Sequence, residues 1–237
     1  MLEIGAIESA NTTEESMLIK LIRRLAGDTS DSFATRLRRK RFSIFESMIV
    51  SLPKPVRILD VGGTQLFWEN MRFCGADEMR CVILNLLEIK TTLPNFRSIV
   101  GDARDMHQIN DNEFDVAFSN SVIQFVGPGG YEDQREMAKE IRRVANKFFV
   151  QTPYRHFPME PHYLLPFFQY LPLAAKVWLL THFKIGWCNN IPNRQTALEI
   201  ARQVRLLTKK ELAELFPHGT ITEEKVLGIT KSLIVHN

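Results

Sequence analysis

Two spacings of apolar residues alternate along residues 32–153. Short continuous apolar runs, rich in β-branched residues and followed by a polar position, are typical of buried parallel strands. They predict strands at 56–60, 80–85, 97–102, 114–119 and 147–152. Apolar residues at helical spacing predict helices at about 32–52, 65–73 and 133–145. Strands that alternate with helices predict a doubly wound α/β sheet with right-handed crossovers.

The pattern differs at the two ends of the chain. A helical pattern over 13–27 predicts an amphipathic helix near the N-terminus. Near the C-terminus, Thr208 and Glu211 have the spacing of a capping box at the start of a helix. Two apolar runs then predict an antiparallel hairpin of strands at 220–226 and 229–235.

Composition places the chain among ordinary globular proteins. Of its 237 residues, 45% are hydrophobic and 24% are charged. A formal net charge of +3 is too small to indicate a nucleic-acid partner by itself. The three cysteines include no C-x-x-C pair, so neither a disulfide framework nor a zinc site is expected. The first residues lack a basic stretch followed by an apolar one, so we expect no signal peptide and a cytoplasmic protein.

The first predicted strand ends in the sequence Asp-Val-Gly-Gly-Thr at 60–64. Glycine permits a sharp turn and leaves no side chain between the backbone and a ligand. The turn lacks the G-x-G-x-x-G spacing of dinucleotide sites, and its acid would repel a pyrophosphate but can bond an ammonium group. Ligands bind at the carboxyl ends of parallel strands, where Asn85, Asp102 and Ser119 also lie. We therefore predict an adenosine-type cofactor site at this edge.

A basic run lies in the predicted helix before this turn. It consists of Arg36, Arg38, Arg39, Lys40 and Arg41. One interpretation is a solvated helix face, and the other is that one arginine reaches an anionic group near the turn.

Several segments, in order, resemble one known family. Segment 58–64 resembles the first motif of the class I S-adenosylmethionine-dependent methyltransferases, 100–106 resembles their third and 114–123 their fourth. The C-terminal helix and two strands are similar to theirs as well. The resemblance covers roughly 32–153 and 205–236 and is strongest to the small-molecule, methyltransferase type 11-like branch. It implies a Rossmann-like sheet of seven strands with the last strand antiparallel, and S-adenosyl-L-methionine as the cofactor.

The resemblance also implies roles for individual residues. Gly62 and Gly63 would approach the methionyl part of the cofactor, with Asp60 beneath it and Thr64 in the same turn. Asn85 would contact the ribose, and Asp102 and Ala103 would contact the adenine. Ser119 and Asn120 would close the pocket.

The sequence departs from the family pattern in three places. Asn85 stands where an acid usually binds the ribose hydroxyls, and Gln65 replaces the usual third glycine. Gln124 and Phe125 stand where many relatives have Glu-His, which removes a candidate base from that loop. We therefore look for a base after the fifth predicted strand.

The loop that follows this strand carries His156, Glu160 and His162 among prolines that restrict the backbone. Because the loop leaves the carboxyl end of a central strand, it faces the cofactor mouth. Either histidine is a candidate base, with Glu160 orienting it or binding a polar acceptor group. The alternative is that these groups hold the loop to its neighbours. A metal site is not expected, because the spacing does not match a helical ligand pair.

The segment 164–187 is strongly apolar and aromatic. Its uncharged run, 163–175, is shorter than the about 20 residues of a membrane-spanning helix. Three interpretations remain: a lid over an apolar acceptor, a dimer contact and an interfacial membrane helix. We favour the lid. The predicted division of the chain is an N-terminal helical extension at 1–31, a cofactor-binding core at 32–153 and 205–237, and an inserted lid at 154–204.

The predicted function is transfer of a methyl group from S-adenosylmethionine to a small, partly apolar metabolite, at oxygen rather than nitrogen or carbon. Three alternatives stay open: a non-catalytic binding or partner protein, a nicotinamide-dependent oxidoreductase and a nucleic-acid methyltransferase. The missing G-x-G-x-x-G spacing counts against the second. The third rests only on the basic run, so no nucleic-acid partner is expected, and the sequence leaves the oligomeric state open.

Overall fold

The computed structural model describes residues 33–160, 162–186 and 188–237. The helix predicted at 13–27 lies outside the described residues, as does the whole of the N-terminal extension predicted at 1–31.

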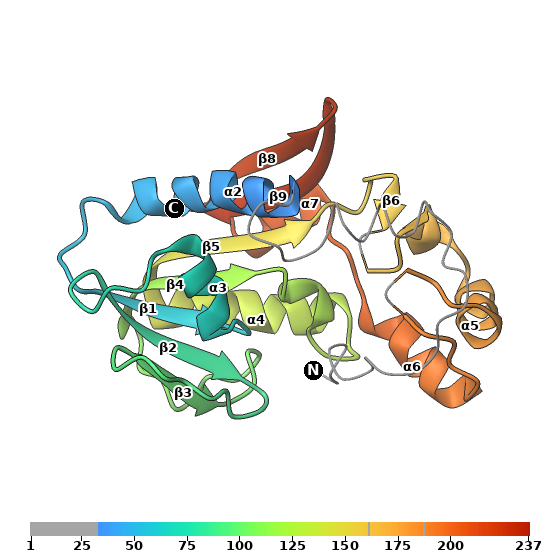
Figure 1. Ribbon diagram of the computed structural model, residues 1–237, viewed down its shortest axis with the longest axis horizontal. Helices are drawn as coiled ribbons and strands as arrows, with labels where there is room; N and C mark the ends of the chain where they lie inside the picture. The colour runs from blue at the N-terminus through green and yellow to red at the C-terminus, as the bar shows by residue number, and fades with distance from the viewer. Residues whose placement is uncertain (1–32, 161, 187) are drawn as a thin grey trace.

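The core of the molecule is one seven-stranded sheet with the order β3-β2-β1-β4-β5-β9-β8 (Figure 1). Strands β1 to β5 are parallel, whereas β9 is antiparallel to both β5 and β8. This order confirms the predicted Rossmann-like sheet with an antiparallel last strand. Because the strand order reverses between β1 and β4, their carboxyl ends flank the topological switch point. The strands are β1 (Val56–Val61), β2 (Met79–Asn85), β3 (Phe96–Val100), β4 (Phe114–Asn120), β5 (Ala145–Pro153), β8 (Thr220–Val226) and β9 (Ile229–His236).

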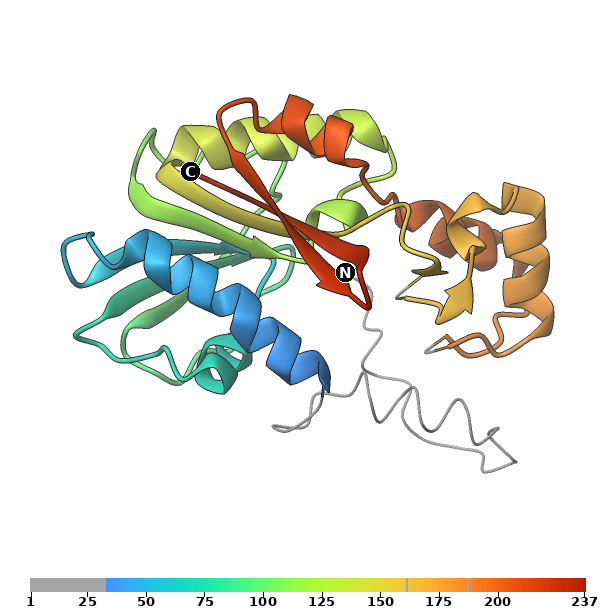
Figure 2. The ribbon, with the colours of Figure 1, turned by 90° about the horizontal axis from the view of Figure 1, so that it is seen from above.

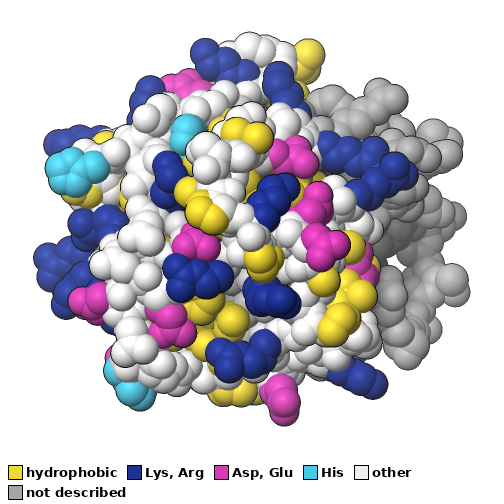
Figure 3. Space-filling model, turned by 90° about the vertical axis from the view of Figure 1, so that its left-hand side faces the viewer, with side chains coloured by type: hydrophobic (Ala, Val, Ile, Leu, Met, Phe, Trp, Pro, Cys, Tyr) yellow, Lys and Arg dark blue, Asp and Glu magenta, His cyan; other side chains and the backbone are white. Residues whose placement is uncertain are grey.

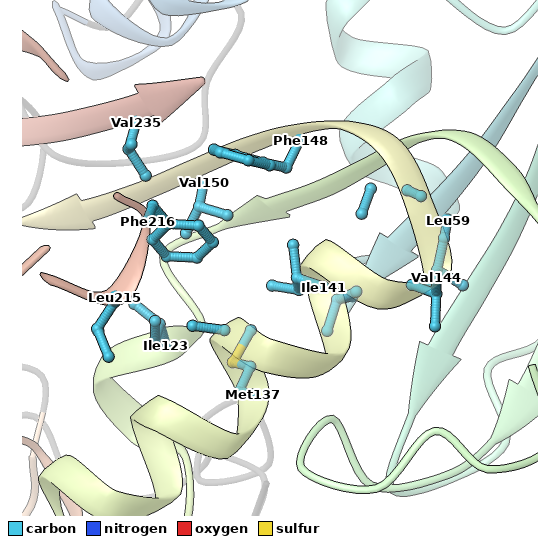
Figure 4. Close-up of a cluster of buried hydrophobic side chains, with 14 of the residues drawn as sticks. Leu59, Ile123, Met137, Ile141, Val144, Phe148, Val150, Leu215, Phe216 and Val235 are labelled. Carbon is cyan, nitrogen blue, oxygen red and sulfur yellow. The ribbon is translucent and has the colours of Figure 1, made fainter. Parts of the chain in front are cut away.

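Helices cover both faces of the sheet (Figure 2). The face packed by α2 (Phe33–Ile49) and α3 (Gln65–Met71) is aromatic, and Phe118 and Phe149 stack there with ring centroids 5.2 Å apart. The other face packs α4 (Tyr131–Val144) and α7 (Lys209–Leu215) over mostly aliphatic side chains (Figure 4).

The capping box at the start of α7 is present as predicted. The Glu211 amide donates to Thr208 Oγ1 at 3.2 Å, and the Thr208 amide donates to the Glu211 carboxylate at 2.7 Å. These reciprocal bonds satisfy two of the backbone donors that a helix start leaves open.

Two connections between parallel strands carry no helix. The connection from β2 to β3 is held to α3 by Gln65, whose Oε1 accepts from the Thr92 amide at 2.8 Å. The connection from β3 to β4 is held to α4, because Glu140 accepts from the Met106 amide at 2.8 Å and Arg143 donates to the Met106 carbonyl at 2.9 Å. Side chains thus hold these loops where helices would otherwise cover the sheet.

The insert, residues 154–204, leaves the carboxyl end of β5 and stands beside the sheet (Figures 1 and 2). It comprises β6 (Met159–Glu160), β7 (Leu165–Pro166), a 3-10 turn η2 (Phe168–Tyr170), α5 (Leu173–His182) and α6 (Arg194–Gln203). Its buried hydrophobic side chains form their own cluster, separate from the two that line the sheet. No helix within the described ranges is long and apolar enough to cross a membrane.

The side of the molecule away from the insert is mixed in charge. Lysine and arginine side chains there are interspersed with acidic and apolar ones (Figure 3). Such a mixture is typical of a solvated surface.

Candidate functional site

The turn after β1 requires both of its glycines. Gly62 has φ +80°, and a Cβ there would lie 2.6 Å from a methyl carbon of Val122. A Cβ on Gly63 would lie 1.9 Å from the carboxylate of Asp60. Any side chain at Gly62 would meet both backbone strain and a clash, and one at Gly63 would collide with the acid. The backbone at this turn is therefore left bare.

Asp60, at the end of β1, is a buried carboxyl with only 1% of its surface exposed. Its Oδ2 accepts from the indole Nε1 of Trp68 at 2.8 Å. Its Oδ1 has no hydrogen-bond partner among the described residues. Burial raises the pKa of Asp60 to about 7, and the indole bond only partly offsets this. A buried acceptor without a donor is costly, so the site favours a donor supplied by a ligand.

A cavity of about 370 Å³ opens beside this turn. The turn contributes Asp60, Gly62, Gly63 and Thr64, and β4 contributes Phe118 and Asn120. Helix α2 contributes Arg38 and Arg39, so part of the basic run lines the cavity beside the turn. The cavity therefore joins a buried carboxylate, exposed backbone and two guanidinium groups.

The other predicted cofactor residues lie at the same edge but outside the lining of this cavity. Asn85 Oδ1 accepts from the Leu86 amide at 2.9 Å, at the end of β2. Asp102 follows β3 and is ion-paired with Arg104 at 2.6 Å; hydrogen bonds from Arg104 lower its pKa. Ala103 is partly buried against the core.

Ser119 and Asn120 differ although they are neighbours at the end of β4. Ser119 is fully buried, and its hydroxyl donates to the Val61 carbonyl at 3.3 Å. That bond ties β4 to β1 at the switch point. Asn120 lines the cavity, as does Thr64 at the start of α3.

The insert brings Glu160 and His162 together. Glu160 is 2% exposed, and its Oε1 lies 2.6 Å from His162 Nδ1. Its Oε2 accepts from the amides of His162 and Tyr163 at 2.8 and 2.7 Å. The imidazole packs edge-on against Phe125, with ring centroids 4.7 Å apart. The pair thus meets the turn η1 (Ile123–Phe125) that follows β4.

His156 lies apart from this pair. It is exposed, and its Nδ1 lies 2.7 Å from the Tyr170 hydroxyl. Within the described ranges, no three His, Cys, Asp or Glu side chains cluster closely enough to hold a metal ion.

Trp68 is a site residue that the sequence interpretation missed, whereas Gln124 was noted there only as a departure from the family pattern. Trp68 is fully buried and holds Asp60 from α3. Gln124 is buried between the Ser121 carbonyl and the Thr152 hydroxyl, at 2.8 and 3.3 Å. The signal that could have identified Trp68 is its position: it is an indole on the helix that directly follows the strand ending in Asp60.

Comparisons with known proteins agree with this geometry. Residues 74–147 match the model of a family described as a methyltransferase domain. This segment begins after the glycine turn and ends within β5. A search of curated protein sequences found no match.

Two solved structures share the fold over most of their length. One is a 1,6-didemethyltoxoflavin-N1-methyltransferase of Burkholderia thailandensis, solved with 1,6-didemethyltoxoflavin and S-adenosylhomocysteine. It is 13% identical to this chain, and the match covers 96% of this chain and 92% of that chain with a TM-score of 0.51. The other is the PH0226 protein of Pyrococcus horikoshii OT3, at 17% identity, 94% and 98% coverage and a TM-score of 0.50. At such identities the likeness concerns the fold. These comparisons therefore show a methyltransferase-type fold, with a methyltransferase-domain match over residues 74–147.

Proposed function

We propose that the protein transfers the methyl group of S-adenosylmethionine to an oxygen atom of a small, partly apolar metabolite. The observation that carries the proposal is the buried Oδ1 of Asp60, which has no hydrogen-bond partner in the described part of the chain and belongs to the lining of the cavity beside the glycine turn. The methionine end of the cofactor offers an ammonium and a carboxylate. A carboxylate, two guanidinium groups and bare backbone are the partners that such a zwitterion needs.

The residues on this edge fit the cofactor as follows. Asp60 would accept from the ammonium, while Arg38 and Arg39 of α2 would face the carboxylate. Gly62 and Gly63 would let the backbone approach the same end. The adenosine end would fall to Asn85, Asp102 and Ala103, with Asn120 closing the pocket.

When bound, the cofactor supplies a methyl group already activated by its sulfonium. The chain must hold the acceptor in line with that group and exclude water. We assign the second task to the insert, which stands at the carboxyl end of β5. An alcohol or phenol acceptor must also lose a proton.

His162 is the proposed base for that proton. Its Nδ1 is hydrogen-bonded to the carboxylate of Glu160, which fixes the ring and leaves Nε2 to accept the proton of the acceptor hydroxyl. The imidazolium that forms would be stabilised by the same carboxylate. His156, exposed beside Tyr170, is the less favoured candidate.

A small-molecule acceptor is supported by two observations. The Burkholderia enzyme is described as methylating 1,6-didemethyltoxoflavin, a small molecule. The insert also places aromatic side chains, Tyr163 and Phe168, around the cavity that Glu160, the hydrogen-bond partner of the proposed base, lines.

Two measurements test the proposal together. Calorimetry with S-adenosylhomocysteine tests the cofactor site, and a methyl-transfer assay against a panel of alcohols, phenols, amines and nucleic acids tests the reaction. We expect saturable binding and transfer to a hydroxyl-bearing small molecule. Binding without transfer to any acceptor would favour the non-catalytic alternative, and transfer to amines or to nucleic acid alone would contradict the assignment to oxygen.

A further inference from the structure

A second cavity, of about 190 Å³, lies inside the insert. Its lining combines residues of the insert with the segment that returns to the core, and it includes Arg155, Glu160, Gln169, Lys176 and Arg205. The remaining lining is apolar or aromatic. Its volume corresponds to about six water molecules at the liquid's roughly 30 Å³ each. It is large enough for one end of a small organic molecule.

The charges in this cavity are not balanced. Arg205 is neutralised by Glu211, with which it forms an ion pair. The guanidinium of Arg155 makes no hydrogen bond or ion pair within the described part of the chain, and Lys176 Nζ donates only to the Gln169 carbonyl, at 3.2 Å. The carboxylate of Glu160 can neutralise one of these two cations. The cavity therefore keeps about one uncompensated positive charge.

Lys176 is held in an unfavourable environment for a cation. Its Nζ lies 5.7 Å from the centroid of the Phe168 ring, and burial lowers its pKa, although Glu160 partly offsets this. A desolvated ammonium gains most from an anionic partner. An anion in the cavity would supply that partner.

The cavity also contains an acceptor without a donor. Gln169 Nε2 donates to the carbonyls of Arg155 and Phe157 at 3.2 and 2.8 Å, which fixes the orientation of the amide. Its Oε1 is buried and has no hydrogen-bond partner among the residues that the structure describes. A hydroxyl or N–H on a bound molecule would satisfy it.

We propose that this cavity binds the carboxylate end of the methyl acceptor, so that the acceptor is a small organic monoacid with a hydroxyl or N–H near its carboxylate. Lys176 and Arg155 hold the carboxylate, and Gln169 Oε1 accepts from the neighbouring donor. Since Glu160 lines the cavity and also bonds His162, a molecule held there lies one side chain away from the proposed base. A dianion is disfavoured, because Glu160 repels the second charge. The identification of the bound acid as the methyl acceptor rests on the proposed function. The binding of a monoacid in this cavity can be tested without it.

The test is calorimetric binding of acid and neutral pairs to the full chain, with S-adenosylhomocysteine present. The pairs are glycolate with ethylene glycol, and 2-hydroxybenzoate with 2-hydroxybenzyl alcohol; phenyl phosphate serves as the dianion. We expect at least one acid to bind about tenfold more tightly than its neutral partner and than phenyl phosphate. Lys176→Met and Arg155→Met should each lower that affinity about tenfold.

The matched control is Lys184→Met, an exposed lysine of the insert that lines neither cavity. It should leave the affinity unchanged. Thermal unfolding and S-adenosylhomocysteine binding, measured on every variant, distinguish a lost acid site from a lost fold or a failed cofactor assignment. Equal binding of acid and neutral partners, no saturable binding of either acid, or full affinity in both cavity variants would overturn the proposal.

Discussion

The two cavities of this molecule are built in different ways. The cavity beside the glycine turn is bounded by the bare backbone of that turn, by the buried Asp60 and by the aromatic face of the sheet, with Arg38 and Arg39 of α2 at its side. The cavity of the insert is bounded by long, partly exposed side chains from segments far apart in sequence, such as Lys176 and Arg205. We propose that the first is a rigid site for the cofactor and the second an adaptable site that sets specificity.

The largest expected effect comes from Asp60→Asn in the rigid site. The pKa of Asp60 is raised to about 7 in the folded protein, from its ordinary value of 3.8. The folded state therefore binds the proton more tightly, and this group's contribution to stability falls as pH rises from about 4 to about 7. At pH 8 the variant should therefore be more stable than wild type, with a free energy of unfolding higher by up to about 4 kcal/mol. Denaturant titrations at pH 5 and pH 8 measure this.

The same substitution should weaken S-adenosylhomocysteine binding about 100-fold at pH 8, because the ammonium loses an anionic acceptor. The wild-type affinity should fall about tenfold from pH 8 to pH 5.5, as Asp60 takes up a proton, and the variant should lose this dependence. Asp115→Asn is the control. Partial burial raises the pKa of Asp115, but the hydrogen bonds from Arg57 lower it by more, so the net pKa is lowered. Removing this carboxylate should therefore destabilise the protein at pH 8. A stabilised control or an Asp60 variant with full affinity would refute this interpretation.

His162→Ala tests the adaptable site. Removing a general base typically slows proton transfer about 100-fold or more, so kcat should fall by that factor while affinity for S-adenosylhomocysteine stays near wild type. His156→Ala is the matched substitution, since this ring is exposed and bonded to Tyr170. We expect less than a tenfold loss of kcat for it. A parallel loss of turnover and cofactor affinity in His162→Ala would instead indicate a folding role.

Gly62→Ala measures how tightly the rigid site is packed. Gly62 and Gly228 both have φ +80°, but an added Cβ meets Val122 at 2.6 Å in the first and nothing within 4 Å in the second. An alanine therefore meets the same backbone strain at both positions. The difference in unfolding free energy between the two variants reports the clash with Val122 alone. Gly62→Ala should cost about 1–3 kcal/mol more unfolding free energy than Gly228→Ala. Equal costs would show that the turn can relax.

The smallest effect concerns the independence of the insert. Asn193 caps α6, accepting from the amides of Gln195 and Thr196 at 2.9 and 3.1 Å. Asn193→Ala should cost about 1 kcal/mol. Hydrogen exchange should show faster opening of α5 and α6 only, because the insert has its own hydrophobic cluster. Thr208→Ala, which removes the α7 cap, should act on the core instead; exchange that rises evenly through the chain would contradict two separate units.

The sequence predicted the sheet because its signals are local. Strands β1 to β5, the α7 capping box and the hairpin around Gly228 each lie within a short segment whose apolar spacing or capping chemistry is visible directly. The same locality revealed the glycine turn and Asp60. The partners of that acid were harder to predict, because Trp68 reaches it through packing of the helix α3 and Arg38 and Arg39 through packing of α2.

The insert was predicted as a helical lid, but its chemistry was only partly visible. The Glu160 and His162 pair lies two residues apart, so a bond between them could be anticipated. The cavity could not, since it joins Arg155, Lys176 and Arg205 through tertiary packing alone. Long polar side chains show no periodic signal that marks which of them converge.

The central claim is that the buried carboxylate of Asp60 receives the ammonium of the cofactor, and a crystal structure with S-adenosylhomocysteine tests it most directly. The account predicts the homocysteine amino group within hydrogen-bond distance of Asp60 Oδ1, in the cavity that Arg38 and Arg39 also line. A structure in which S-adenosylhomocysteine binds away from that cavity, or in which Asp60 Oδ1 makes no contact with it, would contradict the claim.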